Sequence, residues 1–178
     1  SEVEEVLEDA KRLLKEVEKR VREIDRRAED LLRRSHEKVR RIDKDVKRLL
    51  REVEKKVEEV KEDELKKRLE EELEEILRKH KELAEELKKE NEDALKEHED
   101  LIRRLREELE DVLRRLRERL RKEEVLKKVE DDVRRLDEEV RRSHEDIRKK
   151  VEDNKKRIDE SHEEIRRLAE RVKKEIRK

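Results

Sequence analysis

One apolar pattern recurs at a fixed interval along three stretches of the chain. In the first stretch Leu13, Leu31 and Leu49 fall in register, and the same 18-residue period begins again at Leu65 and at Val125. Such a period makes five turns of α-helix at about 3.6 residues per turn. An apolar stripe with this period therefore runs straight along a helix instead of winding around it. The repeat predicts long, nearly untwisted helices.

The composition supports an all-α fold. Charged residues make up 65% of the 178 residues, yet the net charge is only −1, which argues against the self-repulsion that keeps charged chains unfolded. Hydrophobic residues make up 29%, close to the two in seven of a coiled-coil seam. Most positions hold strong helix formers, and the alternation typical of strands is missing.

The stripe loses its phase at two places, which predicts two turns. Val60 is followed by Leu65, and Leu120 by Val125, and no helical face tolerates a gap of this size. We therefore expect helices over about 2–61, 64–121 and 124–177, folded as an antiparallel up-down-up three-helix bundle that forms a single domain over 1–178. The alternative at this point is one continuous helix that dimerises as a rod.

Polar residues interrupt the apolar stripe at a few positions. Asn91, for example, stands where the neighbouring repeats have Leu73 and Leu109. The complete set contains all five histidines and both asparagines of the chain: Ser35, His36, His80, Asn91, His98, Ser143, His144, Asn154, Ser161 and His162.

Folding the chain at the two phase breaks brings these residues to common levels. Residue i of the first helix then faces about 125 − i on the second helix and i + 120 on the third, because every helical residue rises by the same distance. Three layers result, and a continuous rod gives no reason for them. Their members are Ser35 and His36 with Asn91 and Asn154, His98 with Ser143 and His144 opposite Ala28, and His80 with Ser161 and His162 opposite Ile42 and Val46.

Buried polar groups at one level have a physical use. A buried polar group without a partner costs about 1–3 kcal/mol, so Ser, His and Asn are tolerated in a core only where they bond one another. An apolar seam is indifferent to sliding by a turn, whereas a layered network penalises the wrong alignment. We expect the ten residues to form buried hydrogen-bond networks that specify the register.

Taken together, these features resemble a de novo, parametrically designed helical bundle with built-in hydrogen-bond networks. The resemblance covers the whole chain: the 18-residue register, three near-equal helices, the Ser-His pairs at 35–36, 143–144 and 161–162, and a surface of Glu, Lys, Arg and Asp. It implies a synthetic protein with no natural substrate, cofactor or compartment. We expect such a protein to be soluble, and cytoplasmic when a host makes it without a signal.

Several functional classes are disfavoured by what the chain lacks. Gly, Cys and aromatic residues are all absent, which removes phosphate-cradling loops, thiolate chemistry and stacking platforms for nucleic acid. His80 and His98 are five turns apart, about 27 Å, and cannot share a metal ion. We therefore expect no enzymatic activity, no cofactor or metal, and no nucleic-acid or membrane partner.

Two functional hypotheses remain. The first is an inert structural scaffold held by buried polar networks. The second is a pH-responsive switch, because histidine titrates in an accessible pH range and a buried imidazole destabilises the bundle when it gains a proton. Doubled apolar positions, such as Leu13 and Leu14, widen the stripe, as we expect where each helix of a bundle packs against two neighbours. A monomer is favoured, with a homo-oligomer as the alternative.

Overall fold

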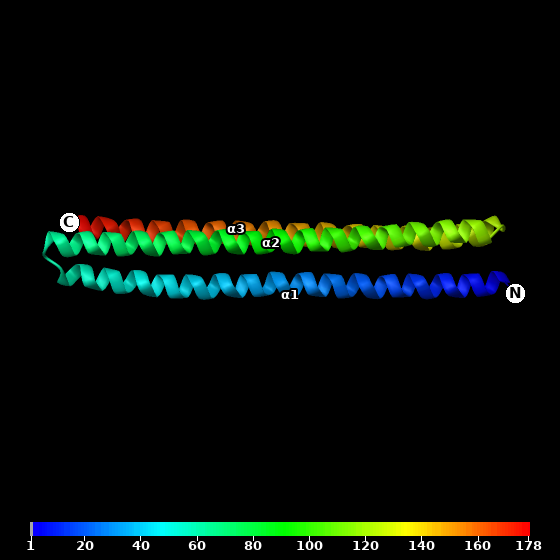
Figure 1. Cartoon of the computed structure of the whole chain (residues 1–178), viewed down its shortest axis with the longest axis horizontal. Coiled ribbons are helices and arrows are strands. Elements are labelled where there is room, and N and C mark those ends of the chain that lie inside the picture. Colours follow the sequence, from blue (N-terminus) through cyan, green and yellow to red (C-terminus); the bar gives the residue numbers. More distant parts are fainter. Residues whose placement is uncertain (1) are drawn as a thin grey trace. The chain divides into compact units, whose positions relative to one another are not determined.

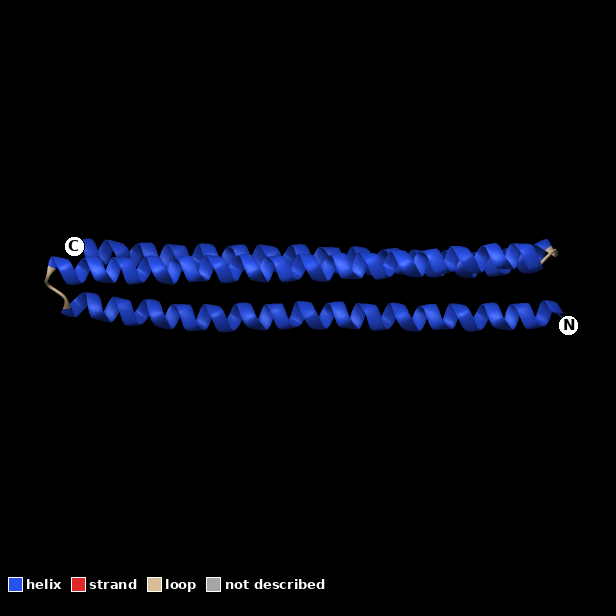
Figure 2. Cartoon of the chain, viewed as in Figure 1, coloured by secondary structure: helices blue, strands red, loops and turns tan. Residues whose placement is uncertain are grey.

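The computed structural model describes residues 2–178, and nearly all of them are helical. Helix α1 covers Glu2–Glu59, α2 covers Asp63–Arg119 and α3 covers Glu123–Arg177. No strand occurs in this part of the chain (Figure 2). The chain direction alternates from α1 to α2 to α3 (Figure 1), which confirms the antiparallel three-helix bundle and excludes one continuous helix.

The turns at 60–62 and 120–122 differ by one or two residues from the helix ends expected from the apolar pattern. Val60 and Leu120 still donate their backbone N–H to the carbonyls of Val57 and Leu116, at 3.4 and 2.8 Å. The chain thus leaves α1 through a tight turn of three residues, whereas the last bond at the end of α2 spans four residues as in an α-helix. No residue from 2 to 178 has a positive φ, which explains how both turns form without glycine.

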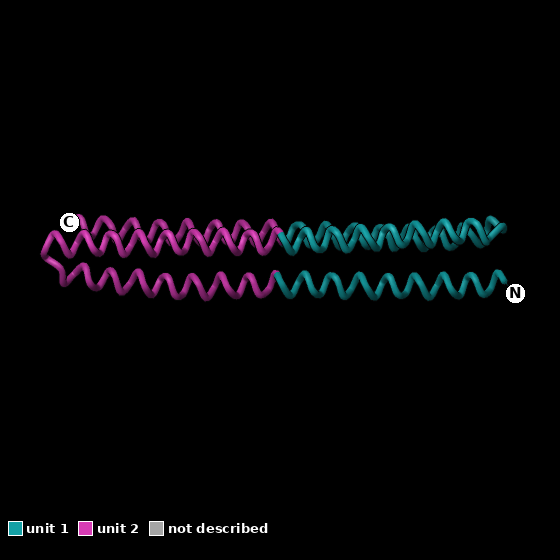
Figure 3. The backbone as a smooth tube through the Cα atoms, viewed as in Figure 1, with its two compact units in different colours: residues 1–31, 93–150 teal, residues 32–92, 151–178 magenta. Residues whose placement is uncertain are grey.

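The chain divides into two compact units, each built from a segment of all three helices (Figure 3). Unit 1 contains residues 1–31 and 93–150, and unit 2 contains residues 32–92 and 151–178. The core of each unit consists of aliphatic side chains from the 18-residue stripe. In unit 1 the core includes Val21, Leu105, Leu109, Leu136 and Val140, and in unit 2 it includes Val53, Leu73, Ile158, Ile165 and Ile176.

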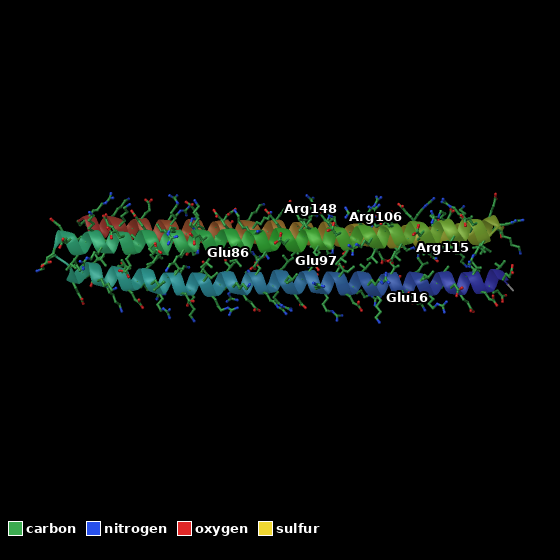
Figure 4. All side chains as sticks on the ribbon, in the orientation of Figure 1. Glu16, Glu86, Glu97, Arg106, Arg115 and Arg148 are labelled. Carbon is green, nitrogen blue, oxygen red and sulfur yellow. The ribbon has the colours of Figure 1, made fainter. Side chains whose placement is uncertain are left out.

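Charged side chains such as Glu16 and Arg115 project outward from the helices (Figure 4). Some of the charged residues pair between helices, as where Arg27 contacts Glu97 at 2.9 Å. Both partners are more than two-fifths exposed, so each such pair contributes at most about 1 kcal/mol. None of the three helices carries an apolar stretch long enough to span a bilayer within residues 2–178.

Candidate functional site

The first polar layer is formed by Ser35, Asn91 and Asn154, one residue from each helix, and we call it the asparagine layer. Asn91 is 1% exposed, and its Nδ2 donates to Ser35 Oγ at 2.8 Å and to the Leu87 carbonyl at 2.7 Å. Asn154 Nδ2 donates to Asn91 Oδ1 and to the Leu32 carbonyl, both at 3.2 Å. Asn91 therefore joins α2 to both of the other helices.

His36 follows Ser35 in the sequence but does not enter the asparagine layer. Its side chain is half-buried, and its Nδ1 accepts from Arg157 Nη1 at 3.4 Å. Consecutive residues of a helix point about 100° apart, so a buried Ser35 turns its neighbour toward the rim. The structure thus places nine of the ten predicted residues in three layers and His36 beside one of them.

The second layer lies in unit 1, and we call it the His98 layer: Asp25, His98, Ser143 and His144. Asp25 Oδ1 accepts from His98 Nε2 at 3.0 Å and from the hydroxyl of Ser143. His98 Nδ1 and His144 Nδ1 are 3.4 Å apart. The other nitrogen of His144, Nε2, lies 3.6 Å from Oε1 of Glu99, which is half-exposed.

The third layer lies in unit 2, and we call it the His80 layer: Asp43, His80, Ser161 and His162. The hydroxyl of Ser161 donates to Asp43 Oδ1, and His80 Nε2 lies 3.6 Å from the same oxygen. His80 Nδ1 and His162 Nδ1 are 2.9 Å apart. The arrangement has the same connections as the His98 layer, with the carboxylate on α1, one imidazole on α2, and serine and histidine on α3.

The two imidazoles of each layer meet nitrogen to nitrogen, in line. The ring planes of His80 and His162 are 12° apart and the ring centres 5.2 Å apart; for His98 and His144 the values are 15° and 5.7 Å. A five-membered ring with bonds of about 1.33 Å has a radius of about 1.1 Å. The Nδ1–Nδ1 distance plus two radii reproduces each centre distance, so both nitrogens lie on the line that joins the centres.

This in-line contact holds one proton, because a hydrogen bond needs one donor and one acceptor. In the His98 layer, the contact of His98 Nε2 with the Asp25 carboxylate assigns the proton of the neutral His98 ring to Nε2. His98 Nδ1 then accepts, and His144 donates through its own Nδ1. The carboxylate on α1 therefore sets the tautomers of two rings.

Burial keeps His80 neutral. Its side chain is 3% exposed, and the loss of solvation, followed by the proximity of His162, lowers the pKa of His80 below its ordinary value of 6.5. The hydrogen bond and charge of Asp43 oppose this and raise the pKa, but by less. The neutral ring is the form that fits the network, because it keeps one acceptor and one donor nitrogen.

Asp25 and Asp43 are the site residues that sequence reasoning missed. The expected residues at these levels were Ala28 for the His98 layer and Ile42 and Val46 for the His80 layer, and Asp25 lies about one turn from Ala28. A usable signal was present: Ile-Asp occurs at 24–25 and again at 42–43, one 18-residue period apart, as the serine-histidine pairs do.

The proximity of aspartate, histidine and serine does not make a catalytic triad. In a triad the serine hydroxyl donates to the imidazole, whereas Ser143 and Ser161 donate to the carboxylate itself. The remaining ring nitrogen of His98 or His80 is occupied by the second imidazole. Within residues 2–178, no group of three or more His, Cys, Asp or Glu side chains is arranged to hold a metal ion.

The polar atoms of the layers satisfy one another. Among residues 2–178, every buried side-chain nitrogen and oxygen has a hydrogen-bond partner. A cavity beside His80, lined by Ala84, Leu87 and Ile158 among others, has a volume of about 10 Å³. That is about the space of one water molecule and far below the roughly 300 Å³ of a ligand pocket.

No family model and no curated protein matches the chain. Among solved structures, the chain is similar to one described as "Computationally designed three helix bundle". The two share 18% sequence identity and superpose with a TM-score of 0.45, over 98% of this chain and 84% of that one.

Proposed function

We propose that the chain is a synthetic structural scaffold whose buried polar layers fix the alignment of its three helices. The observation that carries this proposal is the position of Asn91, which is 1% exposed and bonds side chains from both α1 and α3. A substrate, a cofactor and catalysis form no part of this role. We further propose that residues 1–178 act as one monomeric domain, because most of the apolar stripe faces the two neighbouring helices. The leucines that stay more than a third exposed stand singly, one 18-residue period apart along α1 or α2: Leu13, Leu31, Leu49, Leu65 and Leu83.

The asparagine layer has a task that the histidine layers cannot perform. Each residue of one histidine layer lies one 18-residue period from its counterpart in the other layer. Sliding a helix by that period therefore brings its residue from one histidine layer to the level of the other. Asn91 has Leu73 and Leu109 at its equivalent positions, and a slide of either one period or one turn leaves its amide among aliphatic side chains. Each unpaired group costs about 1–3 kcal/mol, which separates the correct alignment from its competitors.

The direct test replaces the asparagine layer by the apolar residues of the neighbouring repeats. The triple variant Ser35→Val, Asn91→Leu and Asn154→Leu is expected to resist urea at least as well as the parent, because no polar group remains to be desolvated. It is also expected to lose its single alignment and to show several sets of amide resonances or a mixture of masses. The control, Asn91→Leu alone, leaves Ser35 and Asn154 without their partner and loses about 1–3 kcal/mol. A triple variant with one set of resonances and the parent's mass contradicts the proposal.

A second candidate function, a pH-responsive switch, is favoured by the burial of His80. Its pKa in the folded chain is lowered, so the unfolded chain binds a proton at a higher pH than the folded chain does. The stabilising contribution is therefore fully present above about pH 6.5 and is lost as the pH falls toward the folded pKa. Asp43 on α1 and His162 on α3 are the titratable groups that face His80.

Urea unfolding at pH 7.5 and at pH 4.5 tests the switch. We expect the midpoint to fall at pH 4.5, since protonation of His80 favours the unfolded chain. The variant His36→Asn should show the same fall, because His36 lies at the rim and its ring contacts a surface arginine. Equal urea midpoints at the two pH values would contradict the switch and would not affect the scaffold proposal.

A further inference from the structure

The two histidine layers are copies of one module, but the charged residues beside them differ at several positions. Every member recurs one period of the repeat away: Asp25 and Asp43, His98 and His80, Ser143 and Ser161, His144 and His162. The residue that follows the α2 histidine does not recur. It is Glu99 next to His98 and Lys81 next to His80, so the module carries opposite charges at the same register position.

Counting protons shows why that position matters. Two neutral imidazoles carry two protons, one of which lies between the Nδ1 atoms. In the His98 layer both outer nitrogens face carboxylates: His98 Nε2 faces Asp25 at 3.0 Å, and His144 Nε2 faces Glu99 at 3.6 Å. A third proton placed on His144 Nε2 keeps the in-line hydrogen bond and gains an opposite charge. A fourth turns both Nδ1 atoms into donors and breaks the bond.

We propose that the His98 layer is a site for one additional proton, stabilised by Glu99, and that Lys81 disfavours the same proton in the His80 layer. The proposal rests on the hydrogen-bonded layers of the proposed function and adds that the two histidine layers respond differently to acid. On acidification the His98 layer takes up one proton and keeps its contacts. The His80 layer remains neutral down to a lower pH, so its contribution to the free energy of unfolding decreases as the unfolded chain takes up the proton first.

The remaining charged groups around the His98 layer do not change this assignment. Asp25 is the carboxylate that α1 presents to it, and α3 contributes His144 with Glu145 beside it. The carboxylate of Glu145 is bonded to the guanidinium of Arg148, which lowers the pKa of Glu145, and His144 adds a smaller effect in the same direction.

The His80 layer has the same aspartate and the same glutamate–arginine pair, but Lys81 is not the only charge that differs: Lys79 replaces Glu97, and Asp159 replaces Arg141. Asp43 faces the His80 layer from α1, and Glu163 lies next to His162 on α3. Glu163 is bonded to Arg166 just as Glu145 is bonded to Arg148, and its pKa is lowered for the same reason. These matched pairs cannot make the two layers differ. Burial and His162 lower the pKa of His80, in keeping with a layer that lacks a second carboxylate.

Charge exchange at the two positions tests the proposal in the full-length chain. Histidine resonances are followed by NMR from pH 8 to pH 4 in the parent, Lys81→Glu and Glu99→Lys, and each pair is assigned its apparent midpoint. We expect the midpoint of the His98–His144 pair to lie above that of the His80–His162 pair. Lys81→Glu should raise the latter by about 0.5–1 pH unit, and Glu99→Lys should lower the former by a similar amount.

Two controls keep the result interpretable. Glu107→Lys makes the same change in net charge at an exposed position two turns along α2, and it should move neither midpoint by more than about 0.2 pH unit at physiological salt. Glu99→Gln removes the carboxylate without adding a positive charge and should give about half the shift of Glu99→Lys. Both Lys81 and Glu99 are exposed, so the variants keep the core unchanged.

The outcomes separate this inference from the proposed function. A scalar coupling between the two Nδ1 atoms at neutral pH reports the in-line hydrogen bond itself. If that coupling is absent from both pairs, the histidine layers of the scaffold proposal are wrong. If the coupling is present but Lys81→Glu and Glu99→Lys leave the midpoints within the range of the Glu107→Lys control, the layers stand and the one-proton site is overturned.

Discussion

Asp43 shows how much a single side chain does in these layers. Its carboxylate accepts from the hydroxyl of Ser161 and lies 3.6 Å from His80 Nε2. It thereby gives a partner to two buried groups from two other helices, while its own side chain is 23% exposed and keeps some contact with water. A partly hydrated carboxylate costs far less to place than a fully buried one, which is why the charge is tolerated at the edge of the core.

Replacing this carboxylate by an amide should change both titration and stability. We predict that Asp43→Asn shifts the pKa of His80 further down, because Asp43 is the group that raises it against burial. The variant should also lose about 1–2 kcal/mol at pH 7.5, since the charge-assisted hydrogen bond of Ser161 becomes a neutral one. NMR titration and urea unfolding measure the two effects. Asp45→Asn, at an exposed position of the same helix, is the control. An unchanged or higher pKa for His80 contradicts the assigned role.

At single residues, the sequence reveals the polar groups that break an apolar pattern and hides those that do not. Ser, His and Asn stand out wherever the register demands Leu or Val, as at Asn91. Asp25 and Asp43 lie at the edge of the stripe in a chain with 58 acidic residues, where a functional aspartate has the same appearance as a surface one. Only their 18-residue spacing distinguishes them.

At the scale of elements, periodicity predicted the helices well and their ends less closely. The loss of phase between Val60 and Leu65 marks a turn because no helical face accommodates a gap of that size. The final residues depend on individual backbone hydrogen bonds, such as that from Val60 to Val57, which an apolar pattern does not report. The missing glycine was uninformative for the same reason, since neither turn contains a positive φ.

The alignment between helices is also predictable only to about one turn. Equal rise per residue placed the polar residues at three common levels, and the three layers of the structure have these compositions apart from His36 and the two aspartates. Equal rise, however, fixes the level of a residue along the axis and not which side chain at that level reaches the neighbouring helix. Asp25 and Ala28 both lie within one turn of the level of His98, and Asp25 is the residue that meets it.

For the whole molecule, fold stability and fold specificity depend on different residues. The aliphatic cores of both units supply the driving force, as the clusters around Leu109 and Leu73 show. The polar layers add little net stability, because each hydrogen bond replaces one to water. Their contribution is the difference between the correct alignment and its competitors. The single-domain, monomeric state over 1–178 stays a prediction of this account.

The most direct test of that central claim is the side-chain amide spectrum of Asn91 and Asn154. The chain contains no glutamine and no other asparagine, so these two residues give the only side-chain carboxamide signals. We predict that both pairs of signals are well dispersed, exchange slowly with water, and show nuclear Overhauser contacts to each other and, for Asn91, to Ser35. Two overlapped, fast-exchanging pairs without such contacts would contradict the claim that the asparagine layer aligns the helices.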